Sequence, residues 1–262
     1  MLIRYLSKEK FEWLLSDYGL YIGSAAGQSD PKEGLYDSST ITKAVKHRMG
    51  DINQDLFSRL DDLNENLMQL NRKDNYLSSW YAGVTETAEM WNEYGSDGVA
   101  LISDELLLIR LLPEPITNAS SFYEIAYSDQ KKSIAINEPL KFKEEKYRHE
   151  KEFRLVVDMN RYSKLTGFDR EQFGTVYADG KPSYENDLFT CCMSEQGKQQ
   201  SHCVIKAKGD GYVIAYDLNR IIKQIRLHPS ASKDDFLKVK ELLKQAQLDV
   251  TVQVSTLRTI ES

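Results

Sequence analysis

Strand-like and helix-like patterns of apolar residues alternate over the first part of the chain. Leu2 to Leu6 is a short apolar run typical of a strand, and Ser7 can cap a helix that ends at Gly19. Leu20 to Gly23 predicts a second strand, and residues 24–34, rich in small side chains, predict a loop. The chain is therefore expected to begin with strand, helix, strand and loop.

The longest helical pattern covers residues 41–73, which we interpret as a helical insertion. Its second half carries an apolar stripe with spacings of three and four: Ile52, Leu56, Leu60, Leu63, Leu67 and Leu70. The opposite face holds Asp, Asn, Glu and Arg, so the pattern predicts a packing helix or a homodimer through residues 51–72.

The middle of the chain predicts further strands. The expected elements are strands at 76–84, 98–103 and 122–127, a short helix from Thr85 to Tyr94, and a charged helix or loop at 139–147. Residues 150–158 alternate most clearly. Phe153, Leu155 and Val157 fall on one face, and Glu150, Glu152, Arg154 and Val156 on the other.

The C-terminal third predicts an irregular excursion followed by regular elements. Residues 159–200 are polar and contain several glycines. The expected elements after them are hairpin strands at 202–207 and 212–216, a strand at 221–227, a helix opened by the Ser232–Asp235 capping box, and a strand at 250–254. Without repeats or a linker, we expect one α+β domain over residues 1–262, with a mixed, mainly antiparallel sheet and flanking helices.

Composition and charge narrow the class of protein. Hydrophobic residues make up 41% of the 262 and charged residues 28%, which is compatible with a packed core. The net charge of −6 lacks the positive field that non-specific nucleic-acid binding needs. Three cysteines, Cys191, Cys192 and Cys203, form no disulfide framework, and no signal peptide or membrane span is visible, so we expect a cytoplasmic protein.

Motifs of common enzyme classes are missing from the sequence. There is no P-loop, dinucleotide fingerprint or nucleophile elbow. His202 and the cysteines lack the spacing of a common zinc site, so no residue is assigned as a metal ligand.

The first candidate site is the charged face of the strand at 150–158. Glu150 and Glu152 point the same way, and their repulsion is expected to raise the pKa of one carboxyl group. Such a pair suits general acid–base catalysis or stabilisation of a developing cation. The structural alternative is an exposed strand face on which Arg154 pairs with one glutamate.

Two further candidates involve aromatic and small residues. Trp80, Glu86, Trp91 and Tyr94 could form a platform that stacks a planar ring, or could pack in the core. Arg4, with Ser24 and Ser29 in the predicted loop, could hold a phosphate, or could be a surface arginine.

Several of these motifs together resemble one bacterial family of uncharacterised proteins. The matching segments are Ser79-Trp80-Tyr81, Glu86-Thr87, Met90-Trp91-Asn92-Glu93-Tyr94 and Gly98 to Ile102, against C-W-H, E-S, M-W-x-x-Y and G-v-a-i. Asp30-Pro31 and Glu33 resemble its N-D-P-F-E signature, and Glu150, Glu152 and Arg154 resemble its late E-x-E-x-R strand. Ser79 and Tyr81 replace the family's Cys and His, so no catalytic role of those two residues carries over.

The layout is also remotely similar to that of ADP-ribosyltransferases, in which three strands supply Arg or His, Ser or Tyr, and a glutamate, often as E-x-E. Arg4, Ser24 and Glu150-x-Glu152 occur in that order. The resemblance implies a transferase with NAD as substrate, in which Glu152 stabilises an oxocarbenium-like transition state, Glu150 serves the acceptor and Arg4 binds pyrophosphate. The nucleotide-binding residues it implies are Arg4, Ser24, Ser29, Trp80, Glu86, Trp91, Tyr94 and Arg154. It also implies a role as a toxin or in phage defence, with a protein or nucleic acid as acceptor.

Two alternatives remain open from the residues alone. Asp30, Glu86, Glu150 and Glu152 could converge on Mg²⁺ in a nuclease or other hydrolase. The helix at 51–72 could instead dock a partner in a protein without catalytic activity.

Overall fold

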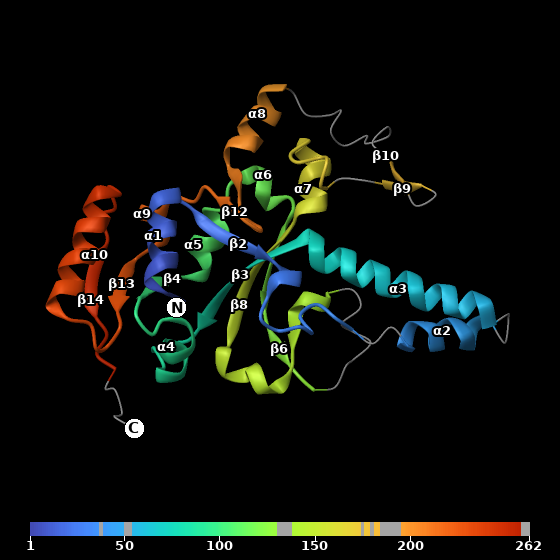
Figure 1. Ribbon diagram of the computed structural model, residues 1–262, viewed down its shortest axis with the longest axis horizontal. Coiled ribbons are helices and arrows are strands. Elements are labelled where there is room, and N and C mark those ends of the chain that lie inside the picture. Colours follow the sequence, from blue (N-terminus) through green and yellow to red (C-terminus); the bar gives the residue numbers. More distant parts are fainter. Residues whose placement is uncertain are drawn as a thin grey trace.

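A ten-stranded sheet runs through the computed structural model, which describes residues 1–36, 39–49, 54–129, 138–173, 176–178, 181–183 and 195–257 (Figure 1). Its strands are β1 (Leu2–Leu6), β2 (Leu20–Ser24), β3 (Asn75–Ala82), β4 (Val99–Ser103), β5 (Ser120–Glu124), β8 (Glu152–Asp158), β11 (Ile205–Lys208), β12 (Gly211–Ile214), β13 (Gln224–Leu227) and β14 (Thr251–Val254). The order is β11-β12-β2-β3-β1-β4-β13-β14, with β8 on β3 and β5 on β8. All pairs are antiparallel except β13 with β14, which confirms the mixed α+β fold.

Strand β3 organises the sheet. One edge pairs with β8 along its length, from Asn75 to Tyr81. The other edge pairs first with β2, at Tyr76 and Leu77, and then with β1, at Tyr81 and Ala82. Because β1 and β2 share this edge in succession, the sheet splits between them.

The pairing registers define two faces of the sheet, since residues opposite each other on neighbouring strands point to the same side. Ile3, Tyr81 and Glu152 are aligned across β1, β3 and β8, and we call their side the carboxylate face. Trp80 and Phe153 are aligned on the other side, which we call the core face.

The core face is covered by helices that bury the larger hydrophobic cluster. They are α1 (Lys8–Asp17), α5 (Glu105–Arg110), α6 (Glu114–Thr117), α7 (Met159–Thr166), α9 (Leu218–Ile221) and α10 (Lys233–Gln245), with α8 (Glu195–Cys203) beside α7. Each of the first six helices contributes at least one buried apolar residue to the cluster, such as Phe11 of α1 and Leu243 of α10. Burial of this apolar surface is the main source of stability on this side.

The carboxylate face carries a shorter cover and two smaller clusters. Its elements are α4 (Ala88–Tyr94) and the 3₁₀ turns η1 (Ala25–Gly27), η3 (Pro139–Lys141) and η4 (Glu145–Glu150). Met90 and Trp91 of α4 pack on Tyr5 and Tyr81, and Leu140 of η3 packs on Val156. Buried charged residues, among them Glu152 and Arg154, lie between these two clusters.

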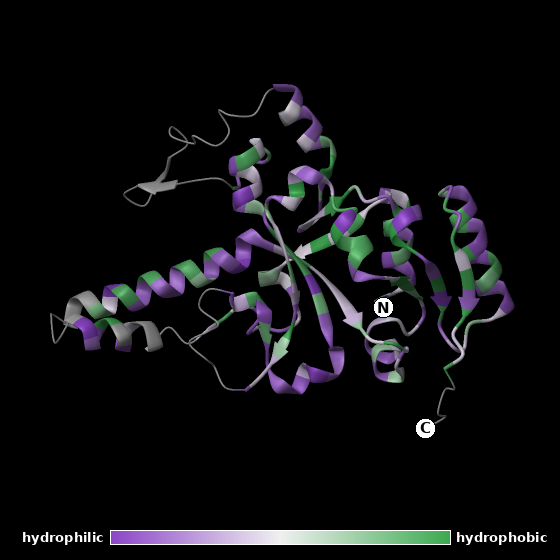
Figure 2. Cartoon of the chain, turned by 180° about the vertical axis from the view of Figure 1, so that it is seen from behind, coloured by the Kyte–Doolittle hydropathy of each residue, from purple (hydrophilic) through white to green (hydrophobic). Residues whose placement is uncertain are grey.

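Helices α2 (Ser39–Met49) and α3 (Gln54–Asp74) project from the body of the molecule as a pair (Figure 1). Apolar residues recur along α3 (Figure 2), yet Leu63 and Leu67 of the predicted stripe are 53% and 50% exposed. Met68, outside the stripe, is buried instead. Ile52 lies outside the described residues.

The structure corrects several expected boundaries. The strand at 150–158 begins at Glu152, and the strand at 122–127 divides into β5 and β6 (Ala126–Tyr127), which pairs with β7 (Phe142–Lys143). The irregular excursion at 159–200 contains α7 and α8, besides β9 (Val176–Ala178) and its partner β10 (Lys181–Ser183). The buried face of α7 was missed because two of its four buried residues are Ser163 and Thr166, which give a weak apolar signal.

Other predictions are confirmed. The hairpin of β11 and β12 turns at Gly209, whose φ of 55° suits glycine, and the Ser232–Asp235 capping box opens α10. Within the described ranges, every helix is too short or too polar to cross a membrane.

Candidate functional site

Arg154 is the centre of a buried network on the carboxylate face. Its side chain is 1% exposed, and its guanidinium group donates to Glu33 Oε1 at 2.7 Å and to Glu152 Oε2 at 2.6 Å. The Leu140 carbonyl accepts a further hydrogen bond at 2.9 Å. The predicted pairing of Arg154 with one of the two glutamates is thus confirmed, and Glu33 is a second, unpredicted partner.

Lys143 continues the network to Glu150. Its ammonium group lies 2.6 Å from Glu152 Oε1 and 2.5 Å from Glu150 Oε2. The sequence of charges is therefore Glu33, Arg154, Glu152, Lys143 and Glu150, three carboxyl groups against two cations. The surplus negative charge falls on the last member, Glu150, which is 2% exposed.

The two neighbouring glutamates respond in opposite ways. Burial raises the pKa of Glu150 to about 7, and the nearby Glu152 carboxylate adds to the rise against the opposing effect of Lys143. Burial would also raise the pKa of Glu152, but Arg154 and Lys143 outweigh it and hold that pKa well below its usual range. The expected separation of the two pKa values is present, with Glu150 as the proton-binding member.

Glu150 reaches this position from a turn and not from the strand. It is the last residue of η4, and Lys151 follows with a φ of 40°, a left-handed conformation that redirects the chain into β8. The turn brings Glu150 next to the end of α4, where the Tyr94 hydroxyl donates to Glu150 Oε1 at 2.7 Å. Thus α4 and η4 together form one side of the site.

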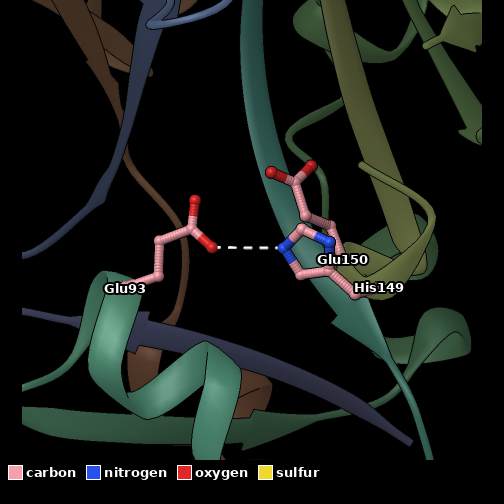
Figure 3. Close-up of side chains that lie close together, drawn as sticks. All are labelled: Glu93, His149 and Glu150. Atoms are coloured by element: carbon pink, nitrogen blue, oxygen red, sulfur yellow. Dashed lines mark hydrogen bonds and ion pairs between the residues drawn. The ribbon is translucent and has the colours of Figure 1, made fainter. Parts of the chain in front are cut away.

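Glu93, His149 and Glu150 converge where α4 meets η4 (Figure 3). One ligand atom from each lies within 4.8 Å of the others, and His149 Nε2 is 3.2 Å from Glu93 Oε2. The His149 Nδ1 atom lies 3.1 Å from the Lys146 carbonyl and Nε2 faces the Glu93 carboxylate, and both oxygens can only accept a hydrogen bond. Protons on both ring nitrogens satisfy these two acceptors. A metal ion between Glu93 and His149 would replace the proton on Nε2, while the hydrogen bond from Nδ1 to the carbonyl orients the ring as in metal-binding histidines.

The charge state of His149 depends on its carboxylate neighbour. Burial disfavours the charged ring, yet Glu93 and the Lys146 carbonyl raise the pKa of His149 above its ordinary value. Within the described part of the chain, these three residues form the one group of His, Cys, Asp and Glu side chains close enough to share a metal ion. Ligand atoms around a tetrahedral ion lie roughly 3.4 Å apart, so small side-chain rotations would complete the set.

The tryptophans predicted to stack a ring are in the interior. Trp80 and Trp91 are each 1% exposed, and Trp91 Nε1 donates to Glu86 Oε1 at 3.1 Å. Glu86 Oε2 in turn accepts from Arg226 at 2.8 Å. The alternative of core packing is the one the structure supports, and Glu86 lies outside the Glu93–His149–Glu150 cluster.

Arg4 lies on the core face, opposite Glu152. Its partner across β3 is Trp80, whose ring it overlies at 5.8 Å, and it donates to Ser78 Oγ and to the Tyr21 carbonyl. Among the described residues no carboxylate pairs with it. The structure therefore does not bring Arg4 and Glu152 together, because a strand side chain one register position away points to the other face.

The loop residues predicted near Arg4 have local roles. Ser24 caps η1 through Gly27 N, and Ser29 is exposed. Asp30 is buried and accepts from Lys32 N, which fixes the turn before Glu33. Cys191 and Cys192 lie outside the described residues.

Sequence reasoning missed Glu93, Lys143, His149 and Glu33 as site residues. His149 stands next to Glu150, and Glu93 next to Tyr94, so adjacency to predicted residues was the available signal. Neither pair shows its convergence until α4 and η4 are placed side by side.

Residues 90–172 match the model of a family described as a protein of unknown function, DUF2971. The match covers less than half of the chain, and it supports the expected resemblance to a family of unknown function. The matched segment includes Glu93, His149, Glu150, Glu152 and Arg154. No curated protein and no solved structure matches the chain.

Proposed function

We propose that this protein is a metal-dependent hydrolase whose divalent cation is held by Glu93, His149 and Glu150. The observation that carries the proposal is the convergence of these three side chains within 4.8 Å, with Nε2 of His149 directed at Glu93 and Nδ1 held by the Lys146 carbonyl. A mixed set of one imidazole and two carboxylates suits Mn²⁺ or Zn²⁺.

The electrostatics of the network favour a cation at this position. When it loses its proton, Glu150 gives the buried network one more negative than positive charge, and Glu93 adds another carboxylate beside it. A divalent cation would offset both. Lys143 competes for Glu150, but Glu152 binds the same ammonium group at 2.6 Å and can retain it when Glu150 turns to the metal.

Three protein ligands leave at least one coordination position for water, and a bound metal lowers the pKa of that water to roughly 7. Lys146 and Arg148 precede His149 on η4 and are exposed, each paired with a glutamate. These cations can exchange their carboxylate partners for an anionic substrate. Phosphate esters are therefore the proposed substrate class.

The test is hydrolysis of bis(p-nitrophenyl) phosphate and of single-stranded DNA and RNA with Mn²⁺, Zn²⁺ or Mg²⁺. Glu93→Gln and His149→Ala should each lower the metal-dependent rate at least ~10-fold, because each removes one of the three proposed metal ligands. Glu89→Gln is the matched control, because Glu89 is an exposed glutamate of α4 outside the cluster. No hydrolysis with any of the metals would overturn the proposal.

The second candidate is an NAD-using ADP-ribosyltransferase-like enzyme. Its support is that β1, β2 and β8, the strands that carry Arg4, Ser24 and Glu152, all pair with β3. The separation of Arg4 and Glu152 onto opposite faces removes Arg4 from a shared NAD site. NAD consumption in the presence of chelator, lost in Glu152→Gln, would favour this candidate; a role as a toxin or in phage defence is proposed only with it.

Location and assembly are proposed on separate grounds. The small and odd number of cysteines in the sequence, two of them adjacent, supports a cytoplasmic location. Exposure of Leu63 and Leu67 supports a homodimer, or docking of another partner, through the predicted 51–72 helix. Light scattering of the wild type and of Leu63→Ser tests the dimer directly, since loss of an interface leucine should shift the mass toward the monomer.

A further inference from the structure

A cavity of about 380 Å³ lies on the carboxylate face, beyond the end of the charged network. It is lined by the C-terminal part of α3, by β5, by the end of β8 and by η3. Val156 forms part of its floor, two residues along β8 from Arg154. Leu140 also lines it, and the Leu140 carbonyl accepts from Arg154, so this residue stands between the network and the cavity.

The lining offers hydrogen-bonding groups of both kinds. Asn75 is 8% exposed, and its Nδ2 donates to Asn71 Oδ1 and to the Asn71 carbonyl. The Oδ1 atom of Asn75 has no hydrogen-bond partner among the described residues, so it can accept from a ligand. The Ser121 and Tyr123 hydroxyl groups also line the cavity, and within the described chain neither has a side-chain hydrogen bond.

Charged groups of both signs stand around the same cavity. Glu138 and Asp158 supply carboxylates, and Arg161 supplies a guanidinium group that makes no ion pair in the described part of the chain. Glu138 pairs with Lys141 at 3.1 Å and Asp158 accepts from Arg161 N at 2.8 Å, so the carboxylates are held at the cavity, where they disfavour a phosphate or another dianion by repulsion. A purely apolar ligand would leave the amide and hydroxyl groups without partners, which is unfavourable.

We propose that this cavity binds a sugar ring with neighbouring hydroxyl groups, carried by a free carbohydrate or by a nucleoside. Each hydroxyl of such a ring both donates and accepts, which matches the mixture of carboxylate, amide, hydroxyl and guanidinium groups in the lining. The volume lies in the range of roughly 300–1,000 Å³ typical of small-molecule sites. The site uses none of Glu93, His149 and Glu150, so it does not depend on the proposed metal centre.

Saturation-transfer NMR with adenosine, uridine, glucose and maltose tests the proposal on the full chain. Leu67→Trp and Ser121→Leu each place a larger side chain into the cavity from a partly or fully exposed position. Glu65→Trp is the control, because Glu65 is exposed on the same helix, lies outside its apolar stripe and does not line the cavity. Both cavity variants should weaken binding at least ~10-fold, which is about the effect of losing one hydrogen bond to the ligand. The control should bind as the wild type does.

The ligand panel separates the two sources of the sugar. Transfer to adenosine and uridine alone identifies a nucleoside, transfer to glucose or maltose alone identifies a carbohydrate, and transfer to all four identifies the ring itself. No transfer to any ligand at millimolar concentration, or equal transfer in wild type, Leu67→Trp and Ser121→Leu, would overturn the proposal. Because His149→Ala should bind the sugar normally, failure here and failure of the hydrolase proposal are distinguishable.

Discussion

Arg154, which is buried, and Arg4, which is partly buried, lie on opposite faces of the same sheet and have opposite surroundings. Burial disfavours the charge of Arg154, but Glu152 and Glu33 outweigh it and raise the pKa above its usual range. Among the described residues Arg4 donates to a serine hydroxyl and a backbone carbonyl and overlies the Trp80 ring, and desolvation lowers its pKa to about 10. One arginine is a member of a charge network, and the other is a solitary cation beside the core.

The difference shows which face of the sheet can bind a cation. On the carboxylate face the network ends in a surplus negative charge at Glu150, beside Glu93 and His149. On the core face Arg4 donates to the Tyr21 carbonyl where β1 and β2 separate. No carboxylate of the described residues pairs with it. The carboxylate face therefore has the groups to bind a cation, whereas the core face has a structural arginine.

The largest expected effect is the contrast between Arg154→Met and Arg4→Met. Loss of Arg154 leaves Glu33 and Glu152 buried without their cation, which should lower the free energy of unfolding by ~3–5 kcal/mol. Loss of Arg4 removes two hydrogen bonds of neutral acceptors and also the cost of a buried cation, so a change within ~1 kcal/mol is expected. Urea unfolding measures both, and equal losses would contradict the contrast.

The next effect separates the two glutamates by pH. The pKa of Glu150 is raised in the folded state from 4.5 to about 7, so the folded protein binds more protons between these values and stability falls as pH rises through them. The corresponding loss is at most ~3 kcal/mol. Glu152, whose pKa is lowered, contributes stability above its unfolded pKa and loses it on acidification.

The midpoint of thermal unfolding, measured in chelator between pH 4.5 and 8, should therefore fall as pH rises for the wild type. Glu150→Gln should make that fall smaller, and the remainder comes from His149, whose pKa is also raised in the folded protein. Glu152→Gln should make the decline shallower without abolishing it, because the Glu152 carboxylate adds to the raised pKa of Glu150 but burial is the larger cause. A flat wild-type profile with an unchanged Glu150→Gln profile would show that Glu150 does not bind the extra proton.

The smallest effect concerns the hydroxyl that holds Glu150. Tyr94→Phe removes the 2.7 Å hydrogen bond to Glu150 and should cost ~0.5–1.5 kcal/mol of unfolding free energy. Tyr21→Phe is its matched control, because Tyr21 is 38% exposed against 37% for Tyr94 and its hydroxyl has no hydrogen bond among the described residues. Equal losses in the two variants would remove Tyr94 from the site.

Period-two alternation was enough to place Glu152, Arg154 and Val156 on one face and Phe153, Leu155 and Val157 on the other. It failed for Glu150, because Lys151 has a left-handed conformation and the strand begins only after it, at Glu152. It also gave no register between strands, so it could not show that the pairing of Ile3 with Tyr81 puts Arg4 on the face opposite Glu152.

The partners of the network were beyond reach of the sequence for a related reason. Glu33 bonds to Arg154 across 121 positions of the chain, and Glu93 meets His149 across 56. Such contacts follow from tertiary packing of α4, η3 and η4 on the sheet and not from local spacing. The raised pKa of one of the two carboxyl groups, Glu150 or Glu152, could by contrast be predicted from their closeness in the sequence alone.

Calorimetric titration of Mn²⁺ and Zn²⁺ into chelator-treated protein tests most directly whether Glu93, His149 and Glu150 hold a cation. The wild type should bind one ion of at least one of these metals, more tightly at pH 8 than at pH 6, because the metal displaces the proton of Glu150. Binding should be lost in His149→Ala and retained in Glu89→Gln. Absence of binding to the wild type, or equal binding by His149→Ala, would contradict a metal centre at this site.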